Sequence, residues 1–454
     1  MNSSGLMADS ARSANTIEHG DYDGHSDPIA GTRPGFVLAA CDYPGGLAAI
    51  RSLGSAGVPV HVMDRPLLTR GRWSKWASTC TSCPSPASDG RLFVERLIGI
   101  GKRFPGSVLY PTNDDNAFLF GIFRDELESQ FALFQPKVEV VYALLNKRHL
   151  YDLAGQVGLE MPESWFPASV EDLPVDVRGV RFPLVIKPQT QIQYVSKSKG
   201  IFVRERGDLP GAFERFGAEA RFGREVLEYD PHVATPVIQR YLNEASEKIY
   251  SLAGFMDADG NASFRASNKI LQRPRRLGMG VCFEAVEVER ELAEALENLL
   301  RRVGYFGVFE AEFIHSRGRH FLIDMNPRFY GEMGFEVARG LPMAQLVYEA
   351  ALGRAARVKE ALEAASRCNG SGPTAYCHRT VFDLILSNPF AGRMGKEERK
   401  RWRDWYGSHE VVDAIRSPND AMPGIIDALM EIYSGLRHPR GFIRSLAGAP
   451  PSPD

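Results

Sequence analysis

Apolar and acidic residues alternate in two runs, 309–314 and 321–326, which are separated by the polar segment 316–319. Strict alternation is typical of a strand with one polar face, and a short polar segment with a glycine is typical of a turn, so the pattern predicts a β-hairpin. If the turn sets even positions opposite even positions, four polar side chains project from one face: Glu310, Glu312, Asp324 and Asn326.

The N-terminal part of the chain has the order of strand, helix and strand that is typical of a βαβ unit. The segments are a strand at 36–41, a glycine-containing turn at 42–46, a helix that begins near Leu47 and ends at the glycines of 54–57, and a strand at 58–64. A helix at 92–100 and a strand at 108–111 continue this order. The polar loop 112–116 comes next, and it either contacts a ligand at the end of the sheet or only caps the following helix.

Two lysines stand at defined positions of the elements predicted farther along. Apolar residues repeat at helical spacing over 145–157, and Lys147 lies in the first turn of this helix. The apolar run 182–188 predicts a strand that carries Lys187 near its end. The remaining predicted elements are strands at 201–203, 237–242 and 249–256 and helices at 292–303, 333–353, 402–406 and 425–433.

Length and composition limit the classes of protein. The chain has 454 residues, which is too long for one ordinary core and predicts two or three domains. The net charge of -2 argues against non-specific nucleic-acid binding, which needs a strong basic field. No apolar run approaches the roughly 20 residues that a membrane-spanning helix needs. Residues 1–34 are polar and lack the apolar segment of a signal peptide, so we expect a disordered leader on a cytoplasmic protein.

Six cysteines are present, and two of them form the C-x-x-C pair Cys80 and Cys83. This spacing occurs in redox sites and in one half of a zinc site. No second C-x-x-C and no nearby histidine pair completes a zinc site, since Cys368 and Cys377 lie far away in the sequence. Cysteines also serve as small core residues, so we expect a structural or incidental role.

The polar face of the predicted hairpin carries the strongest chemical signal. Three carboxylates and an amide oxygen at close range repel each other unless a cation lies between them, and oxygen-only ligands suit Mg²⁺ rather than zinc or copper. Arg328 follows the last of these residues and supplies positive charge for an anion beside the metal. A carboxylate-held Mg²⁺ next to an arginine is typical of nucleotide phosphate chemistry. The alternative is a solvated hairpin with ordinary surface charges.

From about Gly35 to Gly353, the order of these motifs resembles the ATP-grasp superfamily, in particular its carboxylate–amine ligases and the large subunit of carbamoyl-phosphate synthase. The motifs that carry the resemblance are Pro111-Thr112-Asn113-Asp114, Leu145-Asn146-Lys147 and Asn326-Pro327-Arg328-Phe329. They also resemble a subgroup of predicted carboxylate–amine ligases that contains D-aspartate ligases.

The resemblance implies an α/β and α+β fold. A Rossmann-like pre-ATP-grasp domain would be followed by an ATP-grasp fold, in which two α+β subdomains clasp ATP, and by a mixed, largely helical C-terminal tail. The implied ranges are 1–34 for the leader, 35–135 for the pre-ATP-grasp domain, 136–354 for the ATP-grasp domain and 355–454 for the tail.

The resemblance also implies roles for individual residues. The residues implied to bind ATP are Lys147 and Lys187 on the phosphates, Gln239, Tyr241 and the backbone of Arg240 and Leu242 on the adenine, and Glu247 on the ribose. The residues implied to hold two Mg²⁺ ions, or Mn²⁺ in their place, are Glu312, Asp324 and Asn326. The residues implied to act on the phosphates or the acyl phosphate are Arg328, Lys269 and Arg273. Two features depart from the family pattern: the loop 189–199 has no glycine, and Asp324 replaces the commoner glutamate.

The implied function is that of an ATP-dependent, ADP-forming ligase, which converts a small-molecule carboxylate into an acyl phosphate and joins it to an amine. The acceptor pocket is expected near 42–46, 112–115 and 328–332. The rival interpretations are phosphoryl transfer to another acceptor, bicarbonate activation, and a non-catalytic ATP-binding regulatory protein. A homodimer is the implied assembly, with neither nucleic acid nor membrane as a partner.

Overall fold

Five parallel strands form the first sheet of the computed structural model, in the order β3-β2-β1-β4-β5. The strands are β1 (Phe36–Ala39), β2 (Val60–Asp64), β3 (Thr79–Ser82), β4 (Val108–Leu109) and β5 (Ala132–Leu133), connected through α1 (Pro44–Ser55), α2 (Gly90–Arg103), α3 (Asp114–Ile122) and α4 (Arg124–Glu128). The predicted βαβ unit is therefore present. Strand β3 was not predicted, because its Thr-Cys-Thr-Ser sequence lacks the apolar pattern of the neighbouring strands. It contains Cys80, and all six cysteines are free thiols.

The structure describes residues 33–64, 68–173, 180–196, 200–242, 244, 249–274, 278–368, 371–387 and 394–447. Within this part of the chain, Pro34 onward forms one compact unit. The domain boundaries at 135 and 354 stay predictions. No helix of the described residues is both long and apolar enough to cross a membrane.

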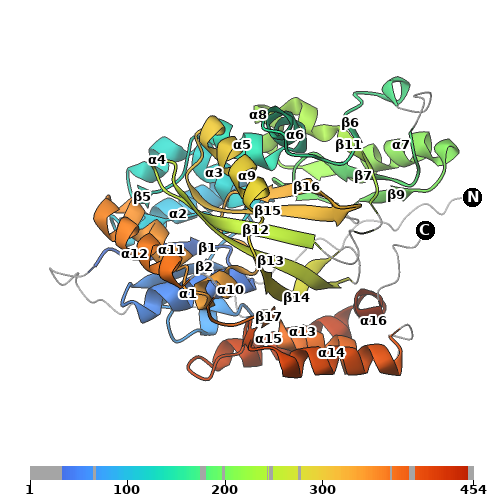
Figure 1. The fold of residues 1–454 in the computed structure, drawn as a ribbon. Helices are drawn as coiled ribbons and strands as arrows, with labels where there is room; N and C mark the ends of the chain where they lie inside the picture. Colours follow the sequence, from blue (N-terminus) through green and yellow to red (C-terminus); the bar gives the residue numbers. More distant parts are fainter. Residues whose placement is uncertain are drawn as a thin grey trace, which may run out of the picture. The chain divides into compact units, whose positions relative to one another are not determined.

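Seven strands form the largest sheet, in the order β16-β15-β12-β13-β14-β17-β18. The strands are β12 (Ile249–Met256), β13 (Ala262–Arg273), β14 (Met279–Val286), β15 (Gly307–Ser316), β16 (Arg319–Asn326), β17 (Ala375–Cys377) and β18 (Val411–Asp413). Neighbours are antiparallel except β17 and β18. Figure 1 shows this sheet running from β16 down to β17, which lies beside the red C-terminal helices. The C-terminal tail therefore extends the sheet that carries the predicted hairpin.

A smaller sheet lies beside the large one and has the order β6-β11-β7-β9. The strands are β6 (Ser164–Trp165), β7 (Leu184–Pro188), β9 (Ile201–Val203) and β11 (Pro236–Arg240), and helix α7 (Leu209–Glu219) packs on them. The predicted helix 145–157 corresponds to α6 (Lys147–Gln156), and a separate helix that was not predicted, α5 (Val138–Leu145), precedes it. Asn146 separates them, because its side-chain oxygen accepts from the backbone N–H of Arg148 and caps α6. Lys147 is consequently the first residue of α6.

The cores show how the hairpin is held. Its apolar side chains Phe309, Ala311 and Phe313 pack with α6 and with α9 (Arg290–Val303). The segment just after the hairpin packs instead with β1 and β2 of the first sheet, through Phe329 and Tyr330. The predicted helix at 333–353 is two helices, α10 (Met333–Ala338) and α11 (Met343–Ala351), which are separated where Gly340 has a φ of 85°. One face of the hairpin is thus apolar, and the other is left for polar side chains.

Candidate functional site

The register of the hairpin depends on a bulge. The turn contains two residues with positive φ, Arg317 at 52° and Gly318 at 75°, as in a type I′ hairpin. This turn pairs even positions with odd ones, for example Ser316 with Arg319. An extra residue on β16, Ile323, then shifts the register. Beyond the bulge, the directly opposed residues are Glu310 with Asn326 and Glu312 with Asp324. The four polar side chains therefore share one face, as expected, although the turn alone would not have placed them there.

Each of the two carboxylates at the bulge faces a lysine. Asp324 Oδ1 lies 2.8 Å from the Lys147 amino group, and Glu312 Oε1 is ion-paired with Lys269. Burial acts to lower the pKa of Lys147, but Asp324 outweighs it and the pKa of Lys147 is raised. Burial acts to raise the pKa of Asp324, but Lys147, followed by Lys187 and Arg328, outweighs it and the pKa of Asp324 is lowered. Four predicted residues from α6, β13, β15 and β16 are thus brought into one charged group.

Arg328 joins the hairpin to the first sheet. Its Nε donates to Asp114 Oδ1 at 2.6 Å, and its Nη2 donates to Asn326 Oδ1 at 2.6 Å. The Asn326 amide donates in turn to Glu310 at 2.7 Å. Asn113 caps α3 by accepting from Asn116 N at 2.9 Å. The loop 112–116 therefore caps a helix and also, through Asp114, reaches the predicted site.

A second group of predicted residues lies on the smaller sheet. The Lys187 amino group donates to Gln239 Oε1 at 3.3 Å, and the Gln239 amide donates to the Tyr151 hydroxyl at 2.8 Å. Desolvation, followed by the charge of Lys147, lowers the pKa of Lys187 to about 8. Within the described residues, Lys187 makes no ion pair. It is therefore a half-buried cation that lacks the carboxylate partner of Lys147 and Lys269.

The strand edge next to Gln239 is partly engaged. The Arg240 N–H donates to Glu163 O at 2.8 Å, so this N–H is already engaged within the chain. The Tyr241 N–H donates to Pro183 O at 3.1 Å, and its ring makes an edge contact with Phe202. Leu242 is the last described residue before a gap, and Glu247 lies outside the described residues. Part of the loop 189–200 also lies outside them.

Arg273 is placed away from the carboxylates. It follows Lys269 on β13 by four residues, but its guanidinium is bound by Glu431 at 2.6 Å and by Ser445 at 3.2 Å. These partners belong to α15 (Met422–Arg437) and α16 (Pro439–Ala447) in the C-terminal tail. The tail residues carried no signal in the sequence that would predict this contact.

Several residues of the site had no individually predicted role, although Tyr43, Tyr330 and Glu332 lie in the segments expected to form the acceptor pocket. Ser251 on β12 donates to Glu310 Oε1 at 2.8 Å. Glu332 is 5% exposed, and burial followed by the charge of Glu310 raises its pKa well above the usual value. Within the described residues, six buried side-chain atoms of this region have no hydrogen-bond partner: Tyr43 OH, Ser267 Oγ, Tyr330 OH, Glu332 Oε1, Glu336 Oε1 and Tyr376 OH. Buried polar atoms are normally paired, so this group is unusual. Two features of the sequence could have pointed to these residues. One is Ser251 in the otherwise apolar strand β12, and the other is Glu332, an acid two residues after Tyr330.

The donor set fits Mg²⁺. Glu312, Asp324 and Asn326 offer only oxygen ligands and lie on one face, and the bulge brings the two carboxylates directly opposite each other. Among the described residues, no three His, Cys, Asp or Glu side chains converge as a ready-made metal site. In the structure, Lys147 and Lys269 neutralise the two carboxylates.

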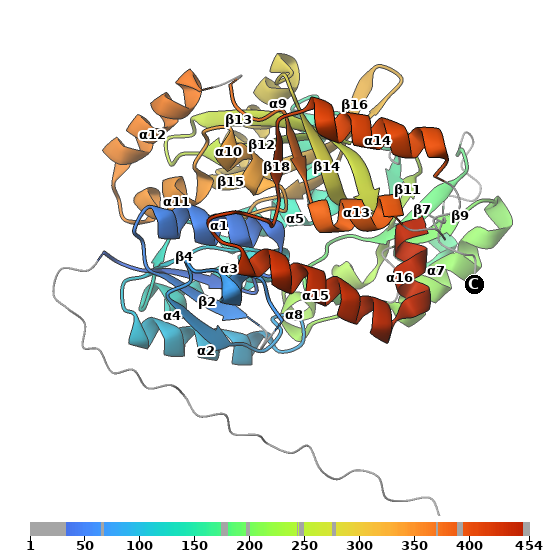
Figure 2. The same ribbon diagram turned by 90° about the horizontal axis from the view of Figure 1, so that it is seen from below.

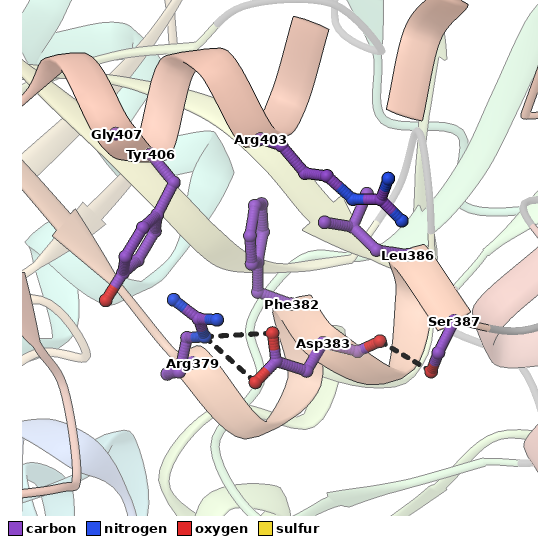
Figure 3. Close-up of a pocket in the computed structure, with 8 residues that line it drawn as sticks. All are labelled: Arg379, Phe382, Asp383, Leu386, Ser387, Arg403, Tyr406 and Gly407. Carbon is purple, nitrogen blue, oxygen red and sulfur yellow. Dashed lines mark hydrogen bonds and ion pairs between the residues drawn. The ribbon is translucent and has the colours of Figure 1, made fainter. Parts of the chain in front are cut away.

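Two surface hollows lie apart from this group. One has a volume of about 510 Å³ and lies between α13 (Arg379–Ser387) and α14 (Lys396–Ser408), where Arg379 is paired with Asp383 (Figure 3). The other, of about 570 Å³, is lined by residues of α5, α6 and α8 (Arg224–Tyr229), including Arg148 and His149. Neither hollow is lined by a predicted site residue.

No protein-family profile matches the sequence, and no curated protein matches it significantly. Solved structures do match. The biotin carboxylase domain dimer of the 2-oxoglutarate carboxylase from Hydrogenobacter thermophilus, in complex with MgADP, ADP and bicarbonate, is 17% identical, with 70% of this chain and 69% of that chain covered and a TM-score of 0.57. Biotin carboxylase from Campylobacter jejuni is 16% identical, with 71% and 72% covered and a TM-score of 0.56.

The L-amino acid ligase from Bacillus licheniformis is 15% identical, with 70% of this chain and 75% of that chain covered and a TM-score of 0.50. At these identities the similarity shows the fold alone. The chain has the mixed α/β ATP-grasp fold that these enzymes share, which confirms the expected fold class. The D-aspartate-ligase-like subgroup stays a prediction.

Proposed function

We propose that this chain is an ATP-dependent, ADP-forming ligase that joins a small-molecule carboxylate to an amine. One observation carries the proposal: the bulged hairpin sets Glu312 and Asp324 opposite each other, each against a lysine, with Arg328 bound to the adjacent Asn326. A face with alternating positive and negative groups suits a metal–triphosphate complex, which carries both signs of charge. L-amino acid ligase, which has the same fold, supports a carboxylate–amine reaction.

The nucleotide would lie between the hairpin face and the smaller sheet. Lys187 supports this position, because a cation without a carboxylate partner suits a phosphate oxygen. Gln239, the carbonyl of Arg240, Tyr241 and Leu242 would contact the adenine, and Glu247 the ribose. The fold neighbour from H. thermophilus is complexed with MgADP, and that from C. jejuni with an ATP analogue, which supports ATP as the ligand here.

Glu312, Asp324 and Asn326 would hold two Mg²⁺ ions, or Mn²⁺ ions, which offset the charge of the transferring phosphoryl group. With metal on these carboxylates, the amino groups of Lys147 and Lys269, which lie against them, would be free to bind phosphate oxygens. Arg328 stays between Asp114 and Asn326, in position to contact the γ-phosphate. The side chain of Arg273 is held by Glu431, so its proposed contribution to the acyl phosphate requires that this ion pair open.

The reaction has two steps. An oxygen of the substrate carboxylate attacks the γ-phosphorus of ATP, the bond to the bridging oxygen breaks, and ADP and an acyl phosphate form. The amine nitrogen then attacks the acyl carbon, loses a proton, and displaces inorganic phosphate. Arg328 and Lys269 stabilise the negative charge on the phosphoryl and acyl oxygens. No protein nucleophile takes part, so positioning of the two substrates is the main contribution of the chain.

The acceptor would bind beside Glu332. The unpaired hydroxyls of Tyr330, Tyr376 and Ser267 and the unpaired oxygen of Glu332 support this position, because a polar substrate would pair them. They lie in the 328–332 part of the expected pocket and next to it. The identity of the acid and the amine is not part of the proposal. We also propose a homodimer, since the biotin carboxylase domain from H. thermophilus forms a dimer.

The test is a trapping experiment with purified protein and Mg-ATP. A panel of amino acids and small acids is screened for release of ADP and phosphate, and hydroxylamine is added to convert an acyl phosphate into a hydroxamate. The proposal predicts a hydroxamate of one organic acid. ADP release without a hydroxamate would favour transfer to another acceptor or bicarbonate activation. ATP binding without any ADP release would favour a regulatory protein.

A further inference from the structure

Helix α15 exposes a row of apolar side chains. Seven of the twelve exposed large hydrophobic residues of the described chain lie in α15 and α16, although these helices are a small part of it. The six on α15 are Met422, Ile425, Leu429, Ile432, Tyr433 and Leu436, with exposed fractions from 41% to 79%. We call them the α15 stripe. In Figure 2 the helix crosses the side that faces the viewer, and no described element is drawn in front of it.

The spacing within the α15 stripe is that of a coiled-coil seam. Met422, Ile425, Leu429, Ile432 and Leu436 follow each other at intervals of three and four residues. A narrow stripe with this period is the pattern by which one helix packs along another. The stripe is therefore shaped for a helix as its partner.

The opposite side of α15 holds the helix in place. Asp427 is fully buried and lies 2.8 Å from Arg70 and 3.4 Å from His378. Glu431 is paired with Arg273 at the end of β13. The helix cannot turn its apolar side inward without breaking these ion pairs, so the exposure of the stripe is built into the fold.

The area and the charges of the stripe both point to a second copy of this chain. At about 200 Å² for a fully exposed large side chain, the stripe and Ile443 expose on the order of 700 Å². This exceeds the roughly 300–600 Å² of the largest patch on a typical monomer and approaches the roughly 800 Å² that each partner buries in a stable complex. The two acids of α15 are turned inward in ion pairs, and Arg437 is bonded to the Tyr433 hydroxyl. Within α15, Arg437 is therefore the one charge left beside the stripe, which otherwise offers a partner apolar surface.

We propose that two copies of this chain pair through antiparallel α15 helices, about a two-fold axis at Leu429. The stripe is symmetric about this residue, because Met422 and Leu436 are each seven positions away from it. An antiparallel pair sets Met422 of one copy against Leu436 of the other, and Ile425 against Ile432 and Tyr433. A surface that is complementary to itself in this way is what a two-fold dimer requires. This inference does not depend on the proposed ligase activity.

Sedimentation velocity of the full chain over a range of concentrations tests the pairing. The wild-type protein is expected to be a dimer, and Leu429→Glu is expected to weaken dimerisation roughly 100-fold or more, since the contact meets the introduced charge twice. Leu92→Glu is the matched control, because Leu92 on α2 is also about half exposed but lies outside the stripe. It should leave the dimer intact. Circular dichroism and thermal unfolding of both variants verify that they are folded.

Cross-linking then tests the position of the axis. In a Cys368→Ser background, which removes the exposed native thiol, Leu429→Cys should form a disulfide-linked dimer under mild oxidation, whereas Leu92→Cys should not. A monomeric wild-type protein at about 100 µM would overturn the proposal. So would a dimer that Leu429→Glu does not weaken, or a Leu429→Cys variant that remains uncross-linked.

Discussion

The hairpin face and the α15 stripe depart from the usual distribution of residues in opposite ways. At the hairpin face, Glu310 and the two facing lysines, Lys147 of α6 and Lys269 of β13, are buried, although charged residues are rarely found inside a protein. On α15, leucine and isoleucine are exposed beside a buried aspartate. Each arrangement is energetically unfavourable in the free protein. An ionic ligand would offset the cost at the hairpin face, and an apolar partner would offset it at α15. Such departures mark the parts of a chain that are selected for binding rather than for folding.

The two regions also differ in how they are stabilised. The buried charges neutralise each other in pairs, so that loss of one partner leaves the other charged and desolvated. The side chains of the α15 stripe are 41% to 79% exposed, so their loss should change the stability of the monomer only slightly. Substitutions in the two regions should therefore separate activity, stability and association.

Glu312→Gln should have the largest effect. It keeps the size of the side chain but removes a carboxylate from the hairpin face and leaves Lys269 without its counter-charge. We expect ATP turnover to fall by more than about 1,000-fold, since both metal and lysine are misplaced. Steady-state ADP release measures this. Glu294→Gln, on the exposed surface of α9, is the control and should be silent. Near-normal turnover of Glu312→Gln would contradict the role of the hairpin face.

Arg328→Ala should lower turnover roughly 100- to 1,000-fold, the effect of losing one donor to a developing anion. Arg328→Lys should recover only part of this loss, because one amino group cannot donate to Asp114 and Asn326 in the fixed geometry of a guanidinium. The yield of trapped hydroxamate per ATP consumed shows whether formation of the acyl phosphate or the later attack by the amine is affected. Full activity of the lysine variant would show that charge alone is needed.

Asp427→Asn should lower the free energy of unfolding by about 3–5 kcal/mol, because Arg70 and His378 lose a buried counter-charge. Leu429→Ser, two residues away on the stripe, should change the stability of the monomer by less than about 0.5 kcal/mol. The stabilities of Asp427→Asn and Leu429→Ser are measured by urea unfolding, at a protein concentration at which the chain is monomeric. Equal losses of stability would contradict the division of α15 into a buried and a binding side.

The loss of stability in Asp427→Asn should also depend on pH. Although burial opposes it, His378 and Arg70 lower the pKa of Asp427, so its stabilisation is present above the usual carboxylate pKa of about 4 and is lost as pH falls through the lowered value. The difference between the wild-type protein and Asp427→Asn should therefore be constant near neutral pH and shrink in acid. A difference that grows in acid would have the wrong sign.

The smallest expected effect is on the pH dependence of ATP binding. Lys187 has a pKa of about 8, so it loses its charge as pH rises through that value, while the raised pKa values of Lys147 and Lys269 keep both charged. ATP should bind roughly tenfold more weakly at about pH 9.5 than at about pH 7. Lys187→Arg should remove this dependence, because arginine stays charged. Calorimetric titration measures it, and a flat profile in the wild-type protein would exclude Lys187 from the phosphate site.

The sequence predicted the elements that carry strong local patterns. The hairpin, the βαβ unit and the strands 201–203 and 249–256 follow from alternation and from apolar runs, which depend only on neighbouring residues. Strand β3 was not predicted, since its polar residues gain their strand conformation by pairing with β2. Strands β17 and β18 were not predicted for the same reason: they are short and are stabilised by the sheet that they extend.

The site was predicted less completely than the fold. Alternation predicted that Glu312 and Asp324 share a face only under the assumption that the turn pairs even positions with even ones. The bulge at Ile323 is what brings the two residues to one face, and no feature of the sequence predicts it. The ion pairs of Arg273 with Glu431 and of Arg70 with Asp427 join residues that are more than 150 positions apart. Long-range contacts of this kind depend on how the elements pack, and no local pattern encodes them.

The central claim is that the polar face of the hairpin binds a metal–nucleotide complex. A crystal structure of the protein with Mg²⁺ and a non-hydrolysable ATP analogue tests it most directly. The expected result is metal density at Glu312 and Asp324, with the triphosphate reaching Lys187 and Arg328. A nucleotide bound elsewhere, or a hairpin on which Lys147 and Lys269 still hold both carboxylates at saturating ligand, would contradict the claim.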